Sequence, residues 1–168
     1  WTRQSLDRPT TLYYKMQIYR ERSDRALPNM AADVPTKPLL EADQQAAMDR
    51  LIDRIAEQSS DNESFALLLV EELLRDSQDQ DRLFLLSSYA DDSLALMLDT
   101  LAMANISAHE LRGIELEDGR RRQTLSSLLE VRSAGQWFVI NPQTGRVGLP
   151  ANFFIWQRGD GAILNITG

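Results

Sequence analysis

The sequence contains no cysteine and a single histidine. Without cysteine, thiol catalysis, disulfide bonds and cysteine-ligated zinc are all excluded. One histidine is too few for a conventional histidine-based metal site. A glycine-rich phosphate-binding loop is also missing. We therefore expect no metal and no cofactor.

Long hydrophobic runs and positive charge are also scarce. No apolar run approaches the ~18 residues that a membrane-spanning helix needs. The 18 basic residues are outnumbered by 25 acidic ones, for a net charge of −7. That balance argues against nucleic acid as a partner, because binding a phosphate backbone needs a broad basic surface. The chain begins at Trp1 without a methionine, so we expect a piece of a longer protein.

The 168 residues suit one domain with a hydrophobic core. Residues 12–19 alternate apolar and polar side chains, which predicts a half-buried strand. Residues 21–38 are polar and hold three prolines, as in a connector. We therefore divide the chain into an N-terminal strand and connector, residues 1–37, and a main domain, residues 38–168.

The main domain begins with helical patterns. An apolar stripe at helical spacing predicts a helix over Glu41–Gln58. Ser60-Asp61-Asn62-Glu63 has the form of a capping box and predicts a second helix that continues to Arg75. A polar break follows over residues 76–81. A third, mostly apolar helix is expected over Ser93–Ala104.

Strand patterns follow the helices. Asp118-Gly119 is a hairpin signal between Glu110–Glu117 and Thr124–Val131. A turn at residues 133–135 leads into Trp137–Ile140, and a last short strand is expected near residues 163–166. Helices followed by an antiparallel sheet give the α+β class.

Two successive predicted strands carry the segments Ser126-Ser127-Leu128-Leu129-Glu130-Val131 and Asn141-Pro142. They resemble the active-site frame of transglutaminases, in which a helix carries the nucleophilic cysteine and two successive strands carry histidine and aspartate. The first segment follows the pattern His-Ala-Trp-x-Glu-Val, and the second follows Asp-Pro. Counting back from the turn after the third predicted helix places the nucleophile near Ala90. The catalytic positions would thus hold Ala90, Ser126 and Asn141. A serine hydroxyl cannot act as a general base near neutral pH, so the resemblance implies a site without catalysis.

A further series extends the resemblance over about residues 38–168. Its members are Glu117-Asp118-Gly119-Arg120-Arg121-Arg122-Gln123, Trp137, Gln143-Thr144-Gly145, Gly148-Leu149-Pro150, Asn152-Phe153 and Trp156-Gln157-Arg158-Gly159. Together they are similar to the inactive transglutaminase-like domain of bacterial membrane proteins with seven transmembrane helices. The resemblance implies a transglutaminase-like (papain-like) fold. It also implies a periplasmic domain of an inner-membrane protein.

Four residues are candidates for ligand contacts. Arg121 and Arg122 could hold a carboxylate or phosphate through bidentate contacts, or could be a solvated hairpin that balances nearby acids. Trp137 and Trp156 could line a peptide groove, or could belong to the core.

We therefore expect a non-catalytic domain that binds a peptide, a cell-envelope component or the membrane-embedded part of its own protein. Two alternatives stay open. One is a hydrolase or acyltransferase with a relocated site that uses Ser88 or Ser93 with His109. The other is a structural spacer, which predicts that side chains such as Leu128 fill the former active-site cleft.

Overall fold

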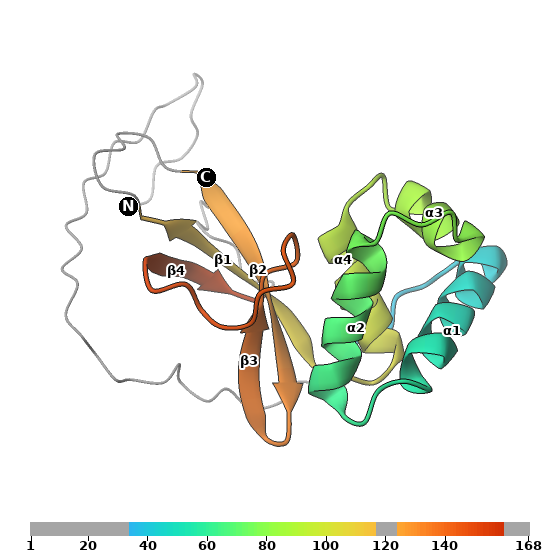
Figure 1. The fold of residues 1–168 in the computed structure, drawn as a ribbon, viewed down its shortest axis with the longest axis horizontal. Coiled ribbons are helices and arrows are strands. Elements are labelled where there is room, and N and C mark those ends of the chain that lie inside the picture. Colours follow the sequence, from blue (N-terminus) through green and yellow to red (C-terminus); the bar gives the residue numbers. More distant parts are fainter. Residues whose placement is uncertain (1–33, 117–123, 160–168) are drawn as a thin grey trace, which may run out of the picture.

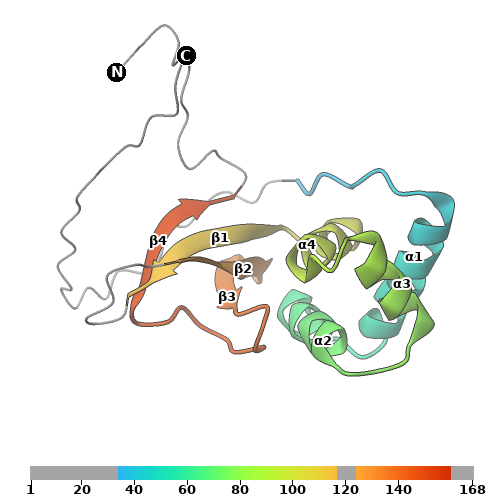
Figure 2. The same cartoon turned by 90° about the horizontal axis from the view of Figure 1, so that it is seen from above.

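A computed structural model describes residues 34–116 and 124–159 of the chain. Within these ranges four helices are followed by four strands, which confirms the α+β class (Figure 1). The helices gather beside one face of the sheet, as the view from above also shows (Figure 2). The elements are α1 (Ala42–Ala56), α2 (Asn62–Leu74), α3 (Gln80–Ser88), α4 (Ser93–Met103), β1 (Ala108–Glu115), β2 (Leu125–Ser133), β3 (Gln136–Ile140) and β4 (Phe153–Arg158).

Three of the helices lie where the sequence predicts them. The cap of α2 is shifted by one residue from the expected box. Asp61, not Ser60, is the N-cap, and its carboxylate accepts the backbone N–H of Ser64 at 2.8 Å. Asp61 satisfies an otherwise orphaned amide of the first helical turn, and its charge suits the positive end of the helix.

Helix α3 was not predicted, because its beginning falls in the polar break. Asp79 caps it by accepting the backbone N–H of Arg82 at 2.8 Å. The guanidinium of Arg82 in turn donates to the carbonyl oxygen of Leu73 at 2.9 Å, near the end of α2. These two contacts end one helix and begin the next within a few residues. The polar segment therefore acts as a tight helix–helix connection.

The sheet is antiparallel, with strand order β3-β2-β1-β4. A two-residue turn at Ala134 and Gly135 joins β2 to β3, and both residues have positive φ (48° and 80°). Two positive φ values are typical of the type I′ hairpin turn, whose twist matches that of the strands. Strand β4 was not predicted. It pairs with β1 through a register shift at Arg112/Gly113.

The main core lies between the helices and one face of the sheet. Leu129, Val131 and Ile140 from the strands join the buried residues of all four helices there. The opposite face of the sheet has a smaller buried cluster of Leu111, Leu128 and Val139, and Phe153 and Ile155 pack against it. Residues that alternate along a strand point to opposite faces, which accounts for the division.

Several predictions concern residues outside the described ranges. These are the strand at residues 12–19, most of the connector, the Asp118-Gly119 turn and the strand at residues 163–166. Among the described residues, no helix is long and apolar enough to span a membrane.

Candidate functional site

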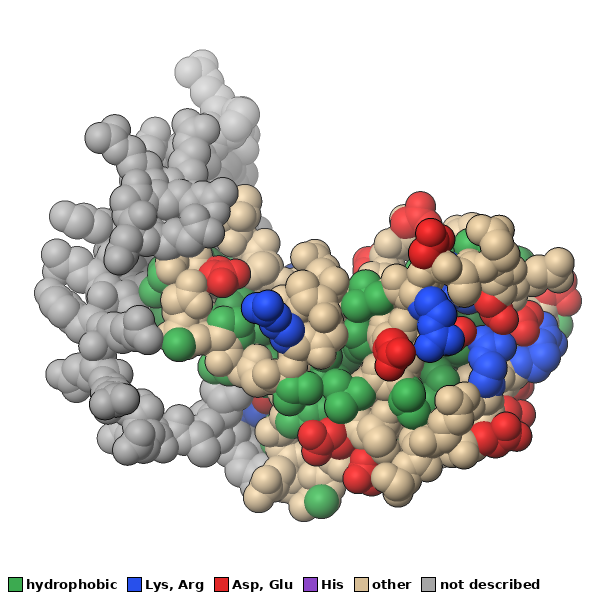
Figure 3. Space-filling model, in the orientation of Figure 1, with side chains coloured by type: hydrophobic (Ala, Val, Ile, Leu, Met, Phe, Trp, Pro, Cys, Tyr) green, Lys and Arg blue, Asp and Glu red, His purple; other side chains and the backbone are tan. Residues whose placement is uncertain are grey.

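A polar cleft of about 540 Å³ lies between the N-terminus of α4 and the sheet. Between the helical part and the sheet part, hydrophobic side chains reach the surface, while charges of both signs mix over the helices (Figure 3). The cleft is lined by Asp91, Asp92, Ser93, Leu94, Ala95, Glu110, Arg112, Leu125, Ser126, Ser127, Pro142 and Gln143. Four separate segments of the chain therefore meet around one space.

The first wall is the turn that leads into α4. Ala90 and Asp91 both have positive φ (51° and 63°), which reverses the chain between α3 and α4. Asp92 then caps α4, and its carboxylate accepts the backbone N–H of Ala95 at 3.0 Å. The helix N-terminus faces the cleft, where a nucleophile would sit in a thiol enzyme. Ala90 has no nucleophilic atom to place there.

The second wall is a polar cluster on β1 and β2. The hydroxyl of Ser127 donates to Glu110 at 2.6 Å, and Arg112 contacts the other oxygen of the same carboxylate at 2.6 Å. Burial by itself raises the pKa of Glu110. The hydrogen bonds from Arg112 and Ser127 and the charge of Arg112 outweigh it, so the pKa is lowered from its ordinary 4.5. Glu110 is thus held as a carboxylate.

Ser126 lines the cleft, but its neighbour Ser127 makes the polar contacts there. Ser127 shares a face of β2 with Leu129, which packs in the main core beside the helices. By the same alternation, Ser126 shares the opposite face with Leu128. Leu128 lies in the smaller buried cluster and does not fill the cleft.

The third wall follows β3. The side-chain oxygen of Asn141 accepts the backbone N–H groups of Gln143 and Thr144 at 2.9 and 3.1 Å. This arrangement is an Asx turn, in which the side chain shapes its own loop. It also directs Pro142 and Gln143 along the edge of the cleft. Ser126 lines the cleft, and Ala90 and Asn141 each directly precede a residue that does.

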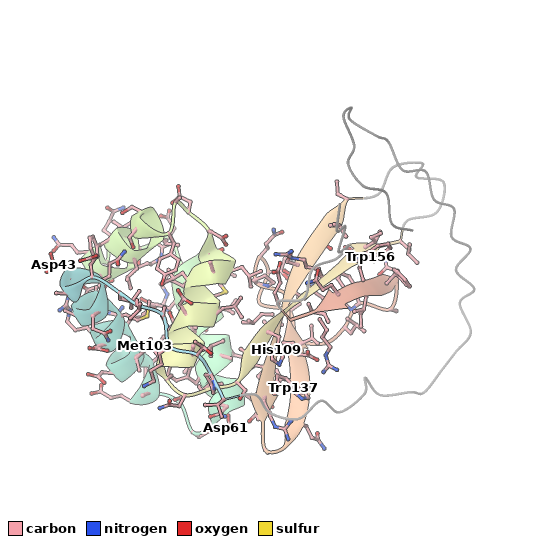
Figure 4. All side chains as sticks on the ribbon, turned by 180° about the vertical axis from the view of Figure 1, so that it is seen from behind. Asp43, Asp61, Met103, His109, Trp137 and Trp156 are labelled. Carbon is pink, nitrogen blue, oxygen red and sulfur yellow. The ribbon has the colours of Figure 1, made fainter. Side chains whose placement is uncertain are left out.

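The only histidine lies elsewhere. His109 packs on Trp137, with ring centroids 4.6 Å apart, and lines a separate cavity beside the C-terminal half of α4 (Figure 4). Ser93 is the first residue of α4, whereas His109 lies beside the other end of this helix, which is about 15 Å long. The hydroxyl of Ser88 donates to the carbonyl oxygen of Leu85. The described residues show no hydrogen bond between a serine and His109, so they do not support a relocated Ser/His site.

Only two of the four candidate binding residues, Trp137 and Trp156, belong to the described part of the chain. Arg121 and Arg122 lie outside the described residues. Trp137 is on β3 and Trp156 is on β4, at opposite edges of the sheet (Figure 4). Trp137 lies beside His109 and under two guanidinium groups, whereas Trp156 packs against Phe154. Neither tryptophan is among the described residues that line the cleft.

Sequence reasoning missed Glu110, Arg112 and Ser127 as residues of the cleft. Alternation along β1 could have placed the two charged side chains on one face. Nothing local indicates that Ser127 would lie opposite them. No group of three or more metal-ligating side chains occurs in residues 34–116 and 124–159.

A family model described as inactive transglutaminase fused to 7 transmembrane helices matches residues 1–89. The match covers α1 to α3 and the N-terminal residues before them, whereas the strand motifs of the cleft lie beyond it. Searches of curated proteins and of solved structures returned no match.

Proposed function

Because the chain belongs to the family of inactive transglutaminases fused to seven transmembrane helices, we propose that it is a non-catalytic domain whose cleft binds a ligand. Its fold is transglutaminase-like (papain-like), with α4 in the place of the helix that carries the nucleophile in active enzymes. The order of the three walls supports this assignment. A helix N-terminus comes first, and the ends of two successive strands follow.

The open cleft is the observation that carries the proposal. A structural spacer needs no cavity at a lost active site, and that alternative predicts that side chains such as Leu128 fill it. Instead Leu128 is 2% exposed on the other face of the sheet, and about 540 Å³ remain open beside α4. This volume lies within the range of small-molecule sites. The polar walls can fix the orientation of a ligand.

The cleft lacks the groups that acyl transfer requires. The described residues of its lining hold no sulfur and no imidazole, and the carboxylate of Glu110 is already engaged by Ser127 and Arg112. A nucleophile needs an adjacent base with a suitable pKa. Binding without turnover therefore fits the cleft better than hydrolysis or acyl transfer does.

The family indicates a membrane protein, and we place this domain on the periplasmic side of a bacterial inner membrane. The ligands available there are peptides, cell-envelope components and the membrane-embedded part of the same protein. The net charge of −7 makes nucleic acid a poor partner.

A thermal-shift screen of peptides and cell-envelope fragments tests the proposal. At a hundredfold excess over its dissociation constant, a ligand that binds only the folded chain adds about 2.7 kcal/mol of stability. For a chain of this size that raises Tm by roughly 5–10 °C. The variant Gln143→Trp, which fills the edge of the cleft, should abolish the shift. The matched variant Gln80→Trp, at the exposed start of α3, should not.

The same variants separate the competing functions. A shift that survives Gln143→Trp places the ligand elsewhere and refutes the proposed site. A broad panel without any shift favours the spacer. Because the chain has no cysteine, Gln143→Cys adds a unique label position in it. The labelling rate of this cysteine by maleimide is then compared between the 168-residue chain and the full protein with its transmembrane helices. Slower labelling in the full protein indicates that the membrane part covers the cleft.

A further inference from the structure

Strand β2 is longer than its partner β3, and the difference leaves an open strand edge inside the cleft. On one side, β1 pairs with β2 from Leu125 to Val131. On the other side, the pairing with β3 runs only from Leu129 to Ser133. In the described part of the chain, residues 125–128 therefore have a strand neighbour on one side only. This edge is about 13 Å long at the usual rise per residue.

The reason β3 stops is local and specific. Asn141 begins an Asx turn, and Pro142 has no N–H to donate to a ladder. The chain then folds back on the outer side of β3, where Val147 bridges Ile140 and Gly148 donates to the carbonyl oxygen of Val139 at 2.8 Å. The loop thus turns away from β2, and within residues 34–116 and 124–159 no other segment pairs with this edge.

The hairpin register shows which backbone groups face this edge. In a two-residue hairpin, the residues that flank the turn form a hydrogen-bonded pair, here Ser133 and Gln136. Every second residue of β2 then points toward β3. Arg132 confirms this alternation, because its N–H points away from β3 and donates to the carbonyl oxygen of Ser107 at 2.9 Å. Continuing the alternation, the N–H and C=O groups of Leu125 and Ser127 face the open edge.

The cleft and the open edge coincide. Leu125 and Ser127 line the cleft, and Gln143 lies across it. Two outward-facing residues offer two donors and two acceptors in the geometry of a β ladder. Leu125 is 52% exposed beside them, and its side chain offers an apolar contact. Backbone groups of this kind recognise another extended backbone, whatever its side chains.

We infer that the cleft binds an extended polypeptide segment, which adds a short antiparallel or parallel strand to the open edge of β2. This inference rests on the proposed function and names the ligand class. The side chains of the cleft add a preference. Among the described residues that line the cleft, Asp91, Asp92 and Glu110 outnumber the one cation, Arg112, so a segment with a basic side chain toward α4 is favoured.

Backbone methylation of the ligand gives the sharpest test. The probe is an array of acetylated, amidated heptapeptides, each prepared plain and N-methylated at either the odd or the even amides. A bound strand uses every second N–H toward β2. For each heptapeptide that binds the 168-residue chain, one methylated form should lose affinity roughly tenfold or more, and the other should lose little. Equal affinity of all three forms overturns the inference.

A pair of variants tests the protein side. Ser127→Ala removes the hydroxyl that donates to Glu110 but keeps the outward N–H. Ser127→Pro removes both, and it spares the β1 ladder because that N–H points the other way. Ser127→Pro should weaken peptide binding by roughly fivefold or more beyond Ser127→Ala. Equal binding by the two variants, with both folded by thermal denaturation, counts against strand addition.

Amide hydrogen exchange keeps the inference testable if Ser127→Pro does not fold. Peptide binding to the wild-type chain should slow exchange at Ser127 more than at Leu128, which already faces β1. Failure of this inference differs from failure of the proposed function. Binding of cell-envelope saccharides by the cleft, without any heptapeptide, overturns strand addition and leaves the proposed function standing. Absence of any ligand overturns both.

Discussion

The buried ion pair between Glu130 and Arg158 gives a prediction with a large expected effect. Two hydrogen bonds, of 2.6 and 2.7 Å, join the guanidinium to both carboxylate oxygens. The side chain of Glu130 is 0% exposed and that of Arg158 is 13% exposed. Arg158 also lies 5.7 Å from the ring centre of Trp137. The pair thus links β2 with the edge strand β4 on the sheet face opposite the helices.

Arg158→Met removes the cation and leaves a buried carboxylate without its partner. Because such a charge cannot regain water, the free energy of unfolding should fall by about 3–5 kcal/mol. Replacing both partners, as Glu130→Leu with Arg158→Met, removes the desolvation penalty together with the attraction. We expect the double variant to recover most of the loss, because buried ion pairs exchanged for apolar side chains are often neutral in stability.

Urea unfolding monitored by circular dichroism measures these differences, provided that the slope with denaturant stays constant across variants. The matched control is Arg50→Met, which breaks an equally short contact with Asp81 at 2.6 Å where the arginine is 58% exposed. That loss should be much smaller, since water screens the exposed pair. A loss below about 1 kcal/mol for Arg158→Met, or a double variant no more stable than the single one, refutes the reasoning.

Three further predictions follow from single contacts. Gly113→Ala should cost about 1–3 kcal/mol in urea unfolding, because the new Cβ would clash with the ring of Phe153 and the carbonyl oxygen of Phe154; an unchanged stability contradicts that close approach. Glu110→Gln should reduce the pH dependence of stability. The lowered pKa of Glu110 gives stabilisation above its ordinary 4.5 that is lost as the pH falls through the folded value, so the gap between wild type and variant should narrow in acid; a constant gap from pH 7 to pH 3 contradicts this. Tyr89→Phe should cost about 1 kcal/mol, since it removes the 2.6 Å hydrogen bond to Asp99, and thermal unfolding of the two proteins checks it.

The sequence predicted most of the helical part because its periodicity is strong. Helices α1, α2 and α4 each carry an apolar stripe or run that needs no distant partner to be recognised. Helix α3 was missed because it has nine residues and Leu85 alone is fully buried. Its formation depends on Asp79 and on the contact of Arg82 with the end of α2, which is a tertiary contact.

Strand β4 was not predicted for a different reason. All six of its residues are partly buried, so it has no alternation of buried and exposed positions to read. The register shift beside Gly113 also breaks the period of two against β1. The pairing that defines this strand joins residues some 40 positions apart in the chain, and no local pattern contains it.

For the site, the sequence by itself determined which chemistry is missing. The lack of cysteine, with Ala90, Ser126 and Asn141 at the catalytic positions of the resemblance, excludes the thiol mechanism from composition alone. Only the tertiary structure decided that these positions border one open cleft and that Leu128 packs on the sheet face opposite the helices. It also decided that β2 extends beyond its pairing with β3. Residue types fix what a site can do chemically. Its shape depends on strand register and helix packing, which are set by contacts between distant parts of the chain.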